Sequence, residues 1–303
     1  MSDSGRSRST ALAWSAIVVI LLGVVGLVTY ALTHASTPAT VTQTALTSPA
    51  ILTTLSTVPP ATFDTVGVSA PGVALTPPQA TAGQPALTSG GRPEVLAVGA
   101  EYCPFCAAER WPLVVALSRF GRFTVLHDAT SANQSVFPGT TTFSFAGARY
   151  VSRYVTFVGV ELYSDQIGAD GKFIRIATLT PPQAALVARY PGSGVGTGDG
   201  TAPFVDVGGR LVTTTSAFSP ALLVGQSQSQ IAGAVTGAAA PTPAPTAGSA
   251  PTPSPGAAIV AAANQLSAGI CAGTGQQPAA VCGSKGVRAA DLALGLDPPP
   301  TSG

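Results

Sequence analysis

The 303-residue chain has a formal net charge of +1 at pH 7, and only 9% of its residues are charged, against about a quarter in an average soluble domain. No basic patch is present, so nucleic acids and acidic polymers are not expected partners. With two histidines, most Cys/His metal sites and Ser/His or Cys/His catalytic pairs are excluded as well. We therefore expect neither a metal nor a cofactor.

The first apolar segment, Ala11–Leu32, contains no charged residue. At about 1.5 Å rise per residue it is long enough to cross a hydrocarbon core of about 30 Å. Arg6 and Arg8 precede it, so the positive-inside rule predicts that residues 1–10 are cytoplasmic and the main domain extracytoplasmic. A cleaved signal peptide is the alternative, but Thr33-His34-Ala35 is a poor cleavage site. We expect a single-pass protein of the cell membrane.

Residues 33–91 are rich in Thr, Ala, Pro and Ser. They contain too few bulky apolar side chains to fold alone, so a flexible tether is predicted. Within it, Ile51–Leu55 and Phe63–Val68 are candidates for short strands or turns.

A different pattern begins at residue 92. Glu94–Gly99 is an apolar run typical of a buried strand, and Cys103-Pro104-Phe105-Cys106 follows it directly. Ala107–Phe120 has helical apolar spacing, and Phe123–His127 is predicted to be a second strand. A strand, helix and strand in this order predict a parallel pair.

Further elements follow along the chain. The pattern predicts strands at Thr140–Phe145, Val155–Leu162 and Phe173–Leu179, and a short helix through Ala188 that Thr180 caps.

The last part of the predicted domain is a hairpin and a helix. Thr201–Val207 and Arg210–Val212 flank a Gly208-Gly209 turn, a hairpin signal, and Ser219–Ile231 is predicted to be helical. Residues 92–235 thus form one α/β domain with a central mixed sheet.

Beyond this domain, residues 236–256 form a Pro/Ala-rich linker or loop. Residues 257–303 are predicted to contain a helix, Ala257–Ile270, a disulfide loop and a disordered tail. Cys271 and Cys282 are expected to form a structural disulfide, and a second redox pair is the alternative. Cysteines in two local pairs fit an oxidising compartment.

The chemistry is expected at Cys103 and Cys106. Unpaired N–H groups and the helix dipole at the start of a helix favour the thiolate of Cys103, which we expect to be exposed. Pro104 suits a first helical turn, and Cys106 is within disulfide reach. Cys103 would form a mixed disulfide that Cys106 resolves. A zinc site or an inert disulfide are alternative interpretations of the motif.

Pro203 is the second candidate element. A proline that opens a strand is either edge-like or cis. We expect a cis bond beside the cysteines, which would leave the backbone of Ala202 free to pair with a substrate segment; an ordinary trans proline is the alternative. Together with Ala202, Pro203, Pro104 and Phe105 are the expected substrate-binding residues.

These features resemble the thioredoxin superfamily: a strand, CPFC, a helix, a strand, and Thr-Ala-Pro203 before a hairpin and helix. The segment AEYCPFCAAERW is also similar to an uncharacterised, membrane-anchored thioredoxin-like family classed under a domain of unknown function. In that family a late Cys pair follows an Ala-Ala-Asn helix, as Ala262-Ala263-Asn264 and the last two cysteines do here. The resemblance implies a thioredoxin-like fold with an insertion, and supplies no substrate.

The sequence departs from the thioredoxin pattern at the buried acid that precedes the motif, because position 97 is Ala. Glu101 is the nearest acid and either substitutes for it or is solvated. Trp111 lines a substrate groove or packs in the core, while His127-Asp128 is interpreted as structural.

The expected function is an extracytoplasmic thiol–disulfide oxidoreductase. Its partners would be exported cysteine-containing proteins and a redox recycling partner. The alternative is a redox-inert binding or structural module of the cell envelope with the same fold.

Overall fold

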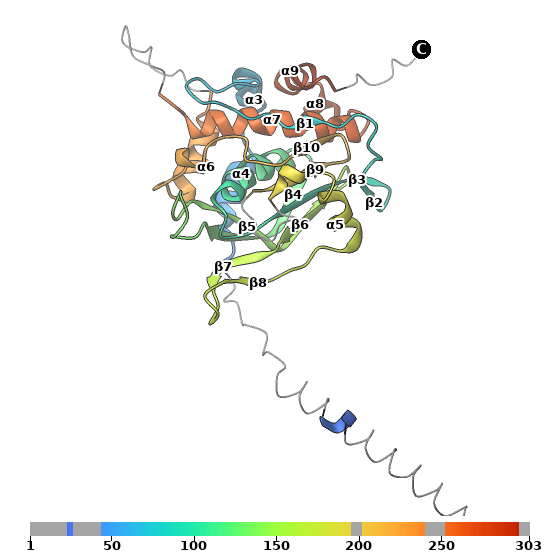
Figure 1. Cartoon of the computed structure of the whole chain (residues 1–303). Coiled ribbons are helices and arrows are strands. Elements are labelled where there is room, and N and C mark those ends of the chain that lie inside the picture. The colour runs from blue at the N-terminus through green and yellow to red at the C-terminus, as the bar shows by residue number, and fades with distance from the viewer. Residues whose placement is uncertain (1–22, 27–43, 195–201, 240–251, 297–303) are drawn as a thin grey trace, which may run out of the picture. The chain divides into compact units, whose positions relative to one another are not determined.

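The computed structural model describes residues 23–26, 44–194, 202–239 and 252–296 (Figure 1). The chain divides into two compact units, residues 1–40 and 41–303. The predicted membrane span, Ala11–Leu32, lies outside the described residues except for residues 23–26, which are helical. Every element named below belongs to the second unit.

The central sheet is mixed, and its middle strand is β3 (Arg92–Gly99). On one side β3 pairs in parallel with β6 (Thr156–Glu161), and on the other it pairs antiparallel with β9 (Phe204–Val207). β9 continues into β10 (Leu211–Thr213). The short strands β1 (Gln79–Ala80) and β2 (Thr88–Ser89) complete the sheet.

The predicted parallel partner of the first strand was wrong. β4 (Gly121–Thr130), which contains Phe123–His127, pairs antiparallel with β5 (Thr141–Ser152) in a separate two-stranded sheet. β4 and β5 follow each other in the chain and pair as a hairpin, so the parallel position beside β3 is left for β6. The order of elements along the chain predicted that β3 has a parallel partner, but it could not identify β6 as that partner.

Alternating side chains of β3 belong to two cores. Val95 and Ala97 pack with α4 (Pro104–Ser118) in the larger core. Leu96 and Val98 pack on the opposite face with residues of α5 (Pro181–Val187). This period of two is what a strand covered on both faces requires, and it places α4 directly over the sheet.

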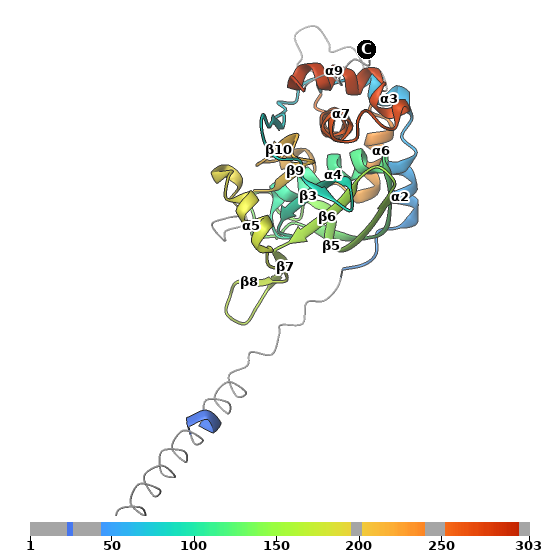
Figure 2. The same cartoon turned by 90° about the vertical axis from the view of Figure 1, so that its right-hand side faces the viewer.

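The helix α7 (Pro255–Gly273) is the longest described element, and nearly all its residues are buried. Figure 2 looks along α7, with α3 (Pro60–Val66) and α9 (Lys285–Leu294) on one side and α4 and the sheet on the other. A Cβ on Gly269 would lie 2.4 Å from Leu211 Cδ1, so only glycine permits this close approach to β10. α7 is apolar and long enough to cross a membrane, but 89% of its apolar window is buried inside the protein.

Residues 44–91 are part of the folded unit, and the predicted tether is wrong there. α2 (Pro49–Ser56) and α3 (Pro60–Val66) are helices that each begin at a proline, where a missing N–H costs little. Leu55 and Phe63 are buried in the main core. Short helices with two or three large apolar residues each are typical of a polar linker by composition, and their burial depends on contacts with helices far away in the sequence.

The C-terminal region also contains more structure than expected. The helix predicted at Ser219–Ile231 is divided in two. Its first part contains a one-turn 3-10 helix at Pro220–Leu222, and α6 (Gln228–Thr236) begins only near its end. α8 (Ala279–Cys282) lies in the predicted disulfide loop, and α9 (Lys285–Leu294) lies where a disordered tail was predicted. Most of the Pro/Ala-rich segment lies outside the described residues. The remaining strands, β7 (Tyr163–Ile167) and β8 (Phe173–Arg175), form a hairpin.

Candidate functional site

The two cysteines of the CPFC motif lie at the start of α4. Cys103 is the N-cap, with extended backbone angles, and its Sγ accepts a hydrogen bond from the backbone N–H of Cys106 at 3.3 Å. Pro104 occupies the first helical position, where no N–H is needed. Both cysteines are free. The helix dipole and the N–H bond therefore act on the sulfur of Cys103, as the sequence predicts.

The expected exposure of Cys103 was wrong: its side chain is 0% exposed and that of Cys106 is 2% exposed. Tyr102, Phe105 and Tyr163 pack around the two sulfurs. Cys103 nevertheless lines a pocket of about 320 Å³. The aromatic residues that flank the motif, together with β7, produce this cover, which the spacing of the cysteines alone could not reveal.

A buried ion pair lies next to the cysteines. Arg110, on α4, contacts both carboxylate oxygens of Glu161 at the end of β6: Nε to Oε1 is 2.9 Å and Nη2 to Oε2 is 2.6 Å. Arg110 Nη2 also donates to the carbonyl of Ala100 at 2.8 Å. The two-point contact satisfies a charge that would be costly to bury alone.

Glu161 and Cys106 meet at Gly99, the last residue of β3. A Cβ at Gly99 would lie 3.1 Å from Cys106 Sγ and 3.6 Å from Glu161 Oε2. Gly99 and Glu161 are paired residues in the parallel register of β3 and β6. The end of the sheet therefore places a carboxylate and the second cysteine next to the same glycine.

The two thiols have opposite pKa shifts. Burial raises the pKa of Cys103, but hydrogen bonds from Cys106 and the charge of Arg110 outweigh it, so the pKa lies below the ordinary 9.0. Burial, and then the neighbouring Cys103, raise the pKa of Cys106 well above 9.0. Cys103 is thus the residue that becomes a thiolate first, which is the order that a nucleophile and a resolving thiol require.

Two more acids are buried near this site. Glu101 is 5% exposed, so the solvated alternative is wrong; burial raises its pKa, and its carboxylate accepts from the hydroxyl of Ser144. Glu109 is 3% exposed, and burial raises its pKa to about 8 although its Oε2 accepts from the N–H of Ala217 at 2.8 Å. Glu109 and Glu161 both line the small cavity beside Cys106.

A small cavity of about 20 Å³ lies beside Cys106, Ala97, Arg110 and Pro203. It is large enough for about one water molecule. Arg110 Nη1 is buried without a hydrogen-bond partner among the described residues. The cavity includes Ala97, the position at which the thioredoxin pattern has an acid.

The structure brings Pro203 to the same cavity as Cys106, but the expected cis bond was wrong. The Ala202–Pro203 bond is trans, and the cis bond found in the described ranges joins Gln277 and Pro278. Pro203 is buried immediately before β9, and Ala202 is half-buried. A strand-initiating trans proline, the alternative from the sequence, is what the backbone adopts.

The other candidate residues are structural. Trp111 is 0% exposed, donates to the carbonyl of Thr141 at 2.9 Å and packs on Phe143. His127 Nδ1 lies 3.0 Å from the carbonyl oxygen of Thr44. Asp128 accepts a hydrogen bond from Gln228.

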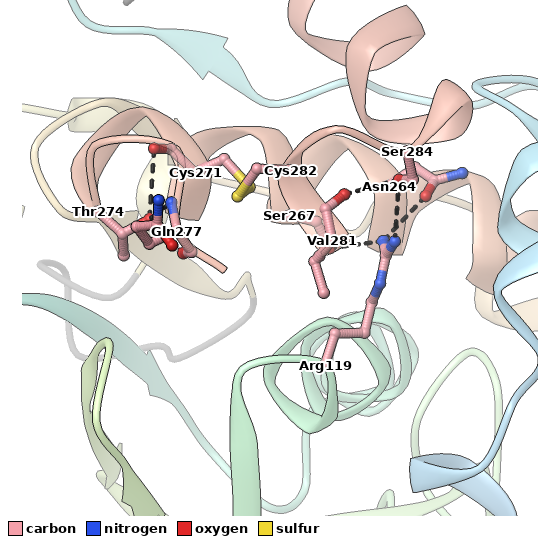
Figure 3. The surroundings of a disulfide bond; sticks show 9 residues. All are labelled: Arg119, Asn264, Ser267, Cys271, Thr274, Gln277, Val281, Cys282 and Ser284. Carbon is pink, nitrogen blue, oxygen red and sulfur yellow. Dashed lines mark hydrogen bonds between the residues drawn. A yellow bond between two sulfur atoms is a disulfide. The ribbon is translucent and has the colours of Figure 1, made fainter. Parts of the chain in front are cut away.

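Cys271 and Cys282 are joined by a disulfide, the pairing that the sequence predicts (Figure 3). It connects the end of α7 to α8. Within the described ranges, no group of three or more His, Cys, Asp or Glu side chains is placed to hold a metal ion.

Sequence reasoning missed Glu161 and did not assign Arg110 to the site. The available signal was a glutamate at the end of an apolar strand, preceding Leu162. It could be connected to the cysteines only after β6, rather than β4, was known to pair with β3.

Residues 80–192 match the model of a family described as a domain of unknown function, DUF929. This segment includes β3, the CPFC motif, α4 and Glu161. No curated protein and no solved structure matches the chain.

Proposed function

We propose that this protein is an extracytoplasmic thiol–disulfide oxidoreductase with a thioredoxin-like fold. The observation that carries the proposal is the sulfur of Cys103, which caps α4 and accepts the N–H of Cys106 next to the buried cation Arg110. A helix N-terminus and a neighbouring cation are the two environments that most commonly create a reactive thiolate.

The strand order supports the proposed fold. The sequence β3–α4–β6 is a βαβ unit, and β9 and β10 extend the sheet on the other side of β3 with antiparallel pairing. This order, β6-β3-β9-β10, puts the cysteine motif at the end of the central strand and Pro203 at the start of its antiparallel neighbour. The hairpin β4–β5, between α4 and β6, is the expected insertion.

In the forward direction, the Cys103 thiolate attacks one sulfur of a client disulfide. A bond between Cys103 Sγ and that sulfur forms, the client S–S bond breaks, and the second client sulfur leaves as a thiolate that takes up a proton. Cys106 then loses its proton and attacks Cys103 Sγ, which releases the first client sulfur as a thiol. The client is reduced and the pair Cys103/Cys106 is oxidised; the reverse steps oxidise a client dithiol.

Arg110 and Glu161 have separate roles in these steps. The positive charge of Arg110 lowers the pKa of both thiols, and it stabilises the thiolate of Cys103. Glu161 holds Arg110 in place through its two-point contact, and the proton of Cys106 passes to the departing client sulfur. A recycling partner of the same thiol–disulfide class returns the pair to its starting state.

The burial of both sulfurs favours one alternative, a redox-inert binding or structural module of the cell envelope. The two functions differ in whether the Cys103/Cys106 couple exchanges with a redox buffer. A couple more oxidising than about −300 mV is exchangeable, and a much lower one is structural.

The test combines a redox titration with trapping. We expect the wild-type couple to equilibrate above about −300 mV, and Cys106→Ser to accumulate mixed disulfides through Cys103 with exported proteins. Cys271→Ser/Cys282→Ser is the matched control and should exchange normally, since that bridge is structural in this proposal. Absence of both exchange and trapped adducts would leave the inert module as the function.

The proposed location follows from the apolar segment Ala11–Leu32, with residues 1–10 in the cytoplasm. Exported proteins in an oxidising compartment are then the accessible clients. A membrane-impermeant protease added to intact cells should digest the domain if it is extracytoplasmic, and should spare it if it is cytoplasmic.

A further inference from the structure

The pocket beside Cys103 has a wall that three separate segments form. Tyr102, Cys103 and Phe105 come from the start of α4, Val136 from the loop between β4 and β5, and Phe173 from β8. The volume of about 320 Å³ is at the lower end for binding pockets. It is large enough for one or two side chains.

The walls of this pocket are mostly apolar and aromatic, although Gln134 and Ser135 also line it. Tyr102 stacks on Phe173, with ring centroids 4.1 Å apart and planes 8° apart. The rings of Phe105 and Phe137 are nearly perpendicular, with centroids 5.9 Å apart. No charged side chain lines the pocket among the residues that the structure describes. A charged group inside would lose its hydration without gaining a partner, whereas an apolar one would be stabilised.

We propose that this pocket binds a bulky apolar side chain that flanks the reacting cysteine of a protein client. The inference rests on the proposed function and adds the substrate class. Cys103 is one of the residues that line the pocket, so an apolar side chain that fills it brings a neighbouring disulfide next to this cysteine. Val136 and Phe173 are the specificity-determining residues.

The proposal predicts a measurable preference. Burial of one large apolar side chain changes a binding or reaction constant by roughly 10- to 100-fold. Peptides with Phe or Leu next to their cysteine should therefore react with Cys103 roughly 10- to 100-fold faster than the same peptides with Asp.

The experiment uses Cys106→Ser, so that Cys103 is the reacting thiol and each adduct persists. Model peptides carry one cysteine as a methyl disulfide, with Phe, Asp or Lys beside it. Cys103 attacks the peptide sulfur, its bond to the methylthio group breaks, and methanethiolate leaves. The rate of adduct formation is measured by mass spectrometry.

A substitution in the pocket tests whether the preference for the Phe peptide arises there. Val136 is 77% exposed, so Val136→Glu should leave folding intact while it places an anion at the pocket. In this background we expect the Phe peptide to slow and the Lys peptide to react fastest. Leu292→Glu, at a position 85% exposed on α9, is the matched control and should keep the preference for Phe.

The outcomes separate this inference from the function on which it rests. Equal rates for the three peptides, or a preference that Val136→Glu does not change, would overturn the apolar pocket and leave the oxidoreductase intact. No adduct with any peptide would instead contradict the proposed function, since Cys103 would then not act as a nucleophile.

Discussion

Gly99 is the residue at which the strand, the second cysteine and the buried carboxylate meet. Its missing Cβ leaves space that Cys106 Sγ and Glu161 Oε2 border. Close packing transmits small displacements because interiors have few voids. The position of the Cys106 thiol therefore depends on Gly99, a residue without a reactive side chain.

We predict that Gly99→Ala slows resolution of the mixed disulfide. The new Cβ would lie 3.1 Å from Cys106 Sγ, closer than ordinary van der Waals contact, so Cys106 must shift by a few tenths of an ångström. We expect a roughly two- to tenfold slower second step, since small misplacements reduce intramolecular rates. Single-turnover quenching with mass detection measures it.

Gly233→Ala is the matched control for this substitution. Gly233 lies in α6, and a Cβ there would have no neighbour within 4 Å, so resolution should proceed at the wild-type rate. Equal rates for the Gly99→Ala variant and wild type would contradict the packing argument.

The raised pKa of Glu109 predicts that the stability of the folded protein depends on pH. Burial raises its pKa from 4.5 to about 8, so the folded protein holds a proton that the unfolded chain releases between these values. The free energy of unfolding therefore decreases as pH rises through this window, at most by about 1.4 kcal/mol for each pKa unit.

Glu109→Gln should remove this contribution. Its amide oxygen can still accept from the N–H of Ala217, so we expect the variant to gain stability relative to wild type as pH rises from about 4.5 to 8. Urea unfolding at both ends of the window measures the difference. The pKa values of Glu101 and Asp206 are also raised, and they affect both proteins equally. A constant difference between the variants would count against a buried, protonated Glu109.

Among the elements, α3, α4, α7 and α9 are connected through Arg119, at the end of α4. Arg119 Nη1 donates to Asn264 Oδ1 and Ser267 Oγ, each at 3.0 Å, and Nη2 reaches Ser284 Oγ at 3.3 Å (Figure 3). The guanidinium lies 3.9 Å from the ring centroid of Phe63. Burial lowers the pKa of Arg119 to about 10, still protonated at neutral pH.

At this scale we predict that Phe63→Ala destabilises the domain. Phe63 is 3% exposed, and truncation of a buried Phe typically costs about 3–5 kcal/mol. Leu46→Ala, at a position 64% exposed, should change stability by less than about 0.5 kcal/mol. Chemical denaturation measures both. A loss near zero for Phe63→Ala would mean that α3 is the detachable tether that the composition suggested.

For the whole molecule, α7 and the disulfide hold the C-terminal region on the sheet. Cys271 and Cys282 are separated by 11 residues, so the loop-entropy model predicts a loss of about 2–3 kcal/mol for Cys271→Ser/Cys282→Ser. We expect a lower denaturation midpoint with nearly unchanged slope. Loss of redox exchange in this variant while it remains folded would instead indicate the alternative in which the bridge is a second redox pair.

The pattern of the sequence determined those features that depend on neighbours along the chain. It predicted β3, α4, the β9–β10 turn at Gly208-Gly209 and most of α7, because apolar periodicity and turn residues are local signals. It also placed Cys103 at a helix start, because a buried strand ends a few residues earlier. The pairing of Cys271 with Cys282 followed from their spacing and number.

Only the tertiary structure decided which distant segments meet. It paired β3 with β6 instead of β4, and this pairing brought Glu161 to Cys106 and to Arg110. It folded α2 and α3 onto the core, and it brought Tyr163, which is far away in sequence, to the cysteines. Such contacts depend on packing and register between elements, about which the periodicity of a single segment carries no information.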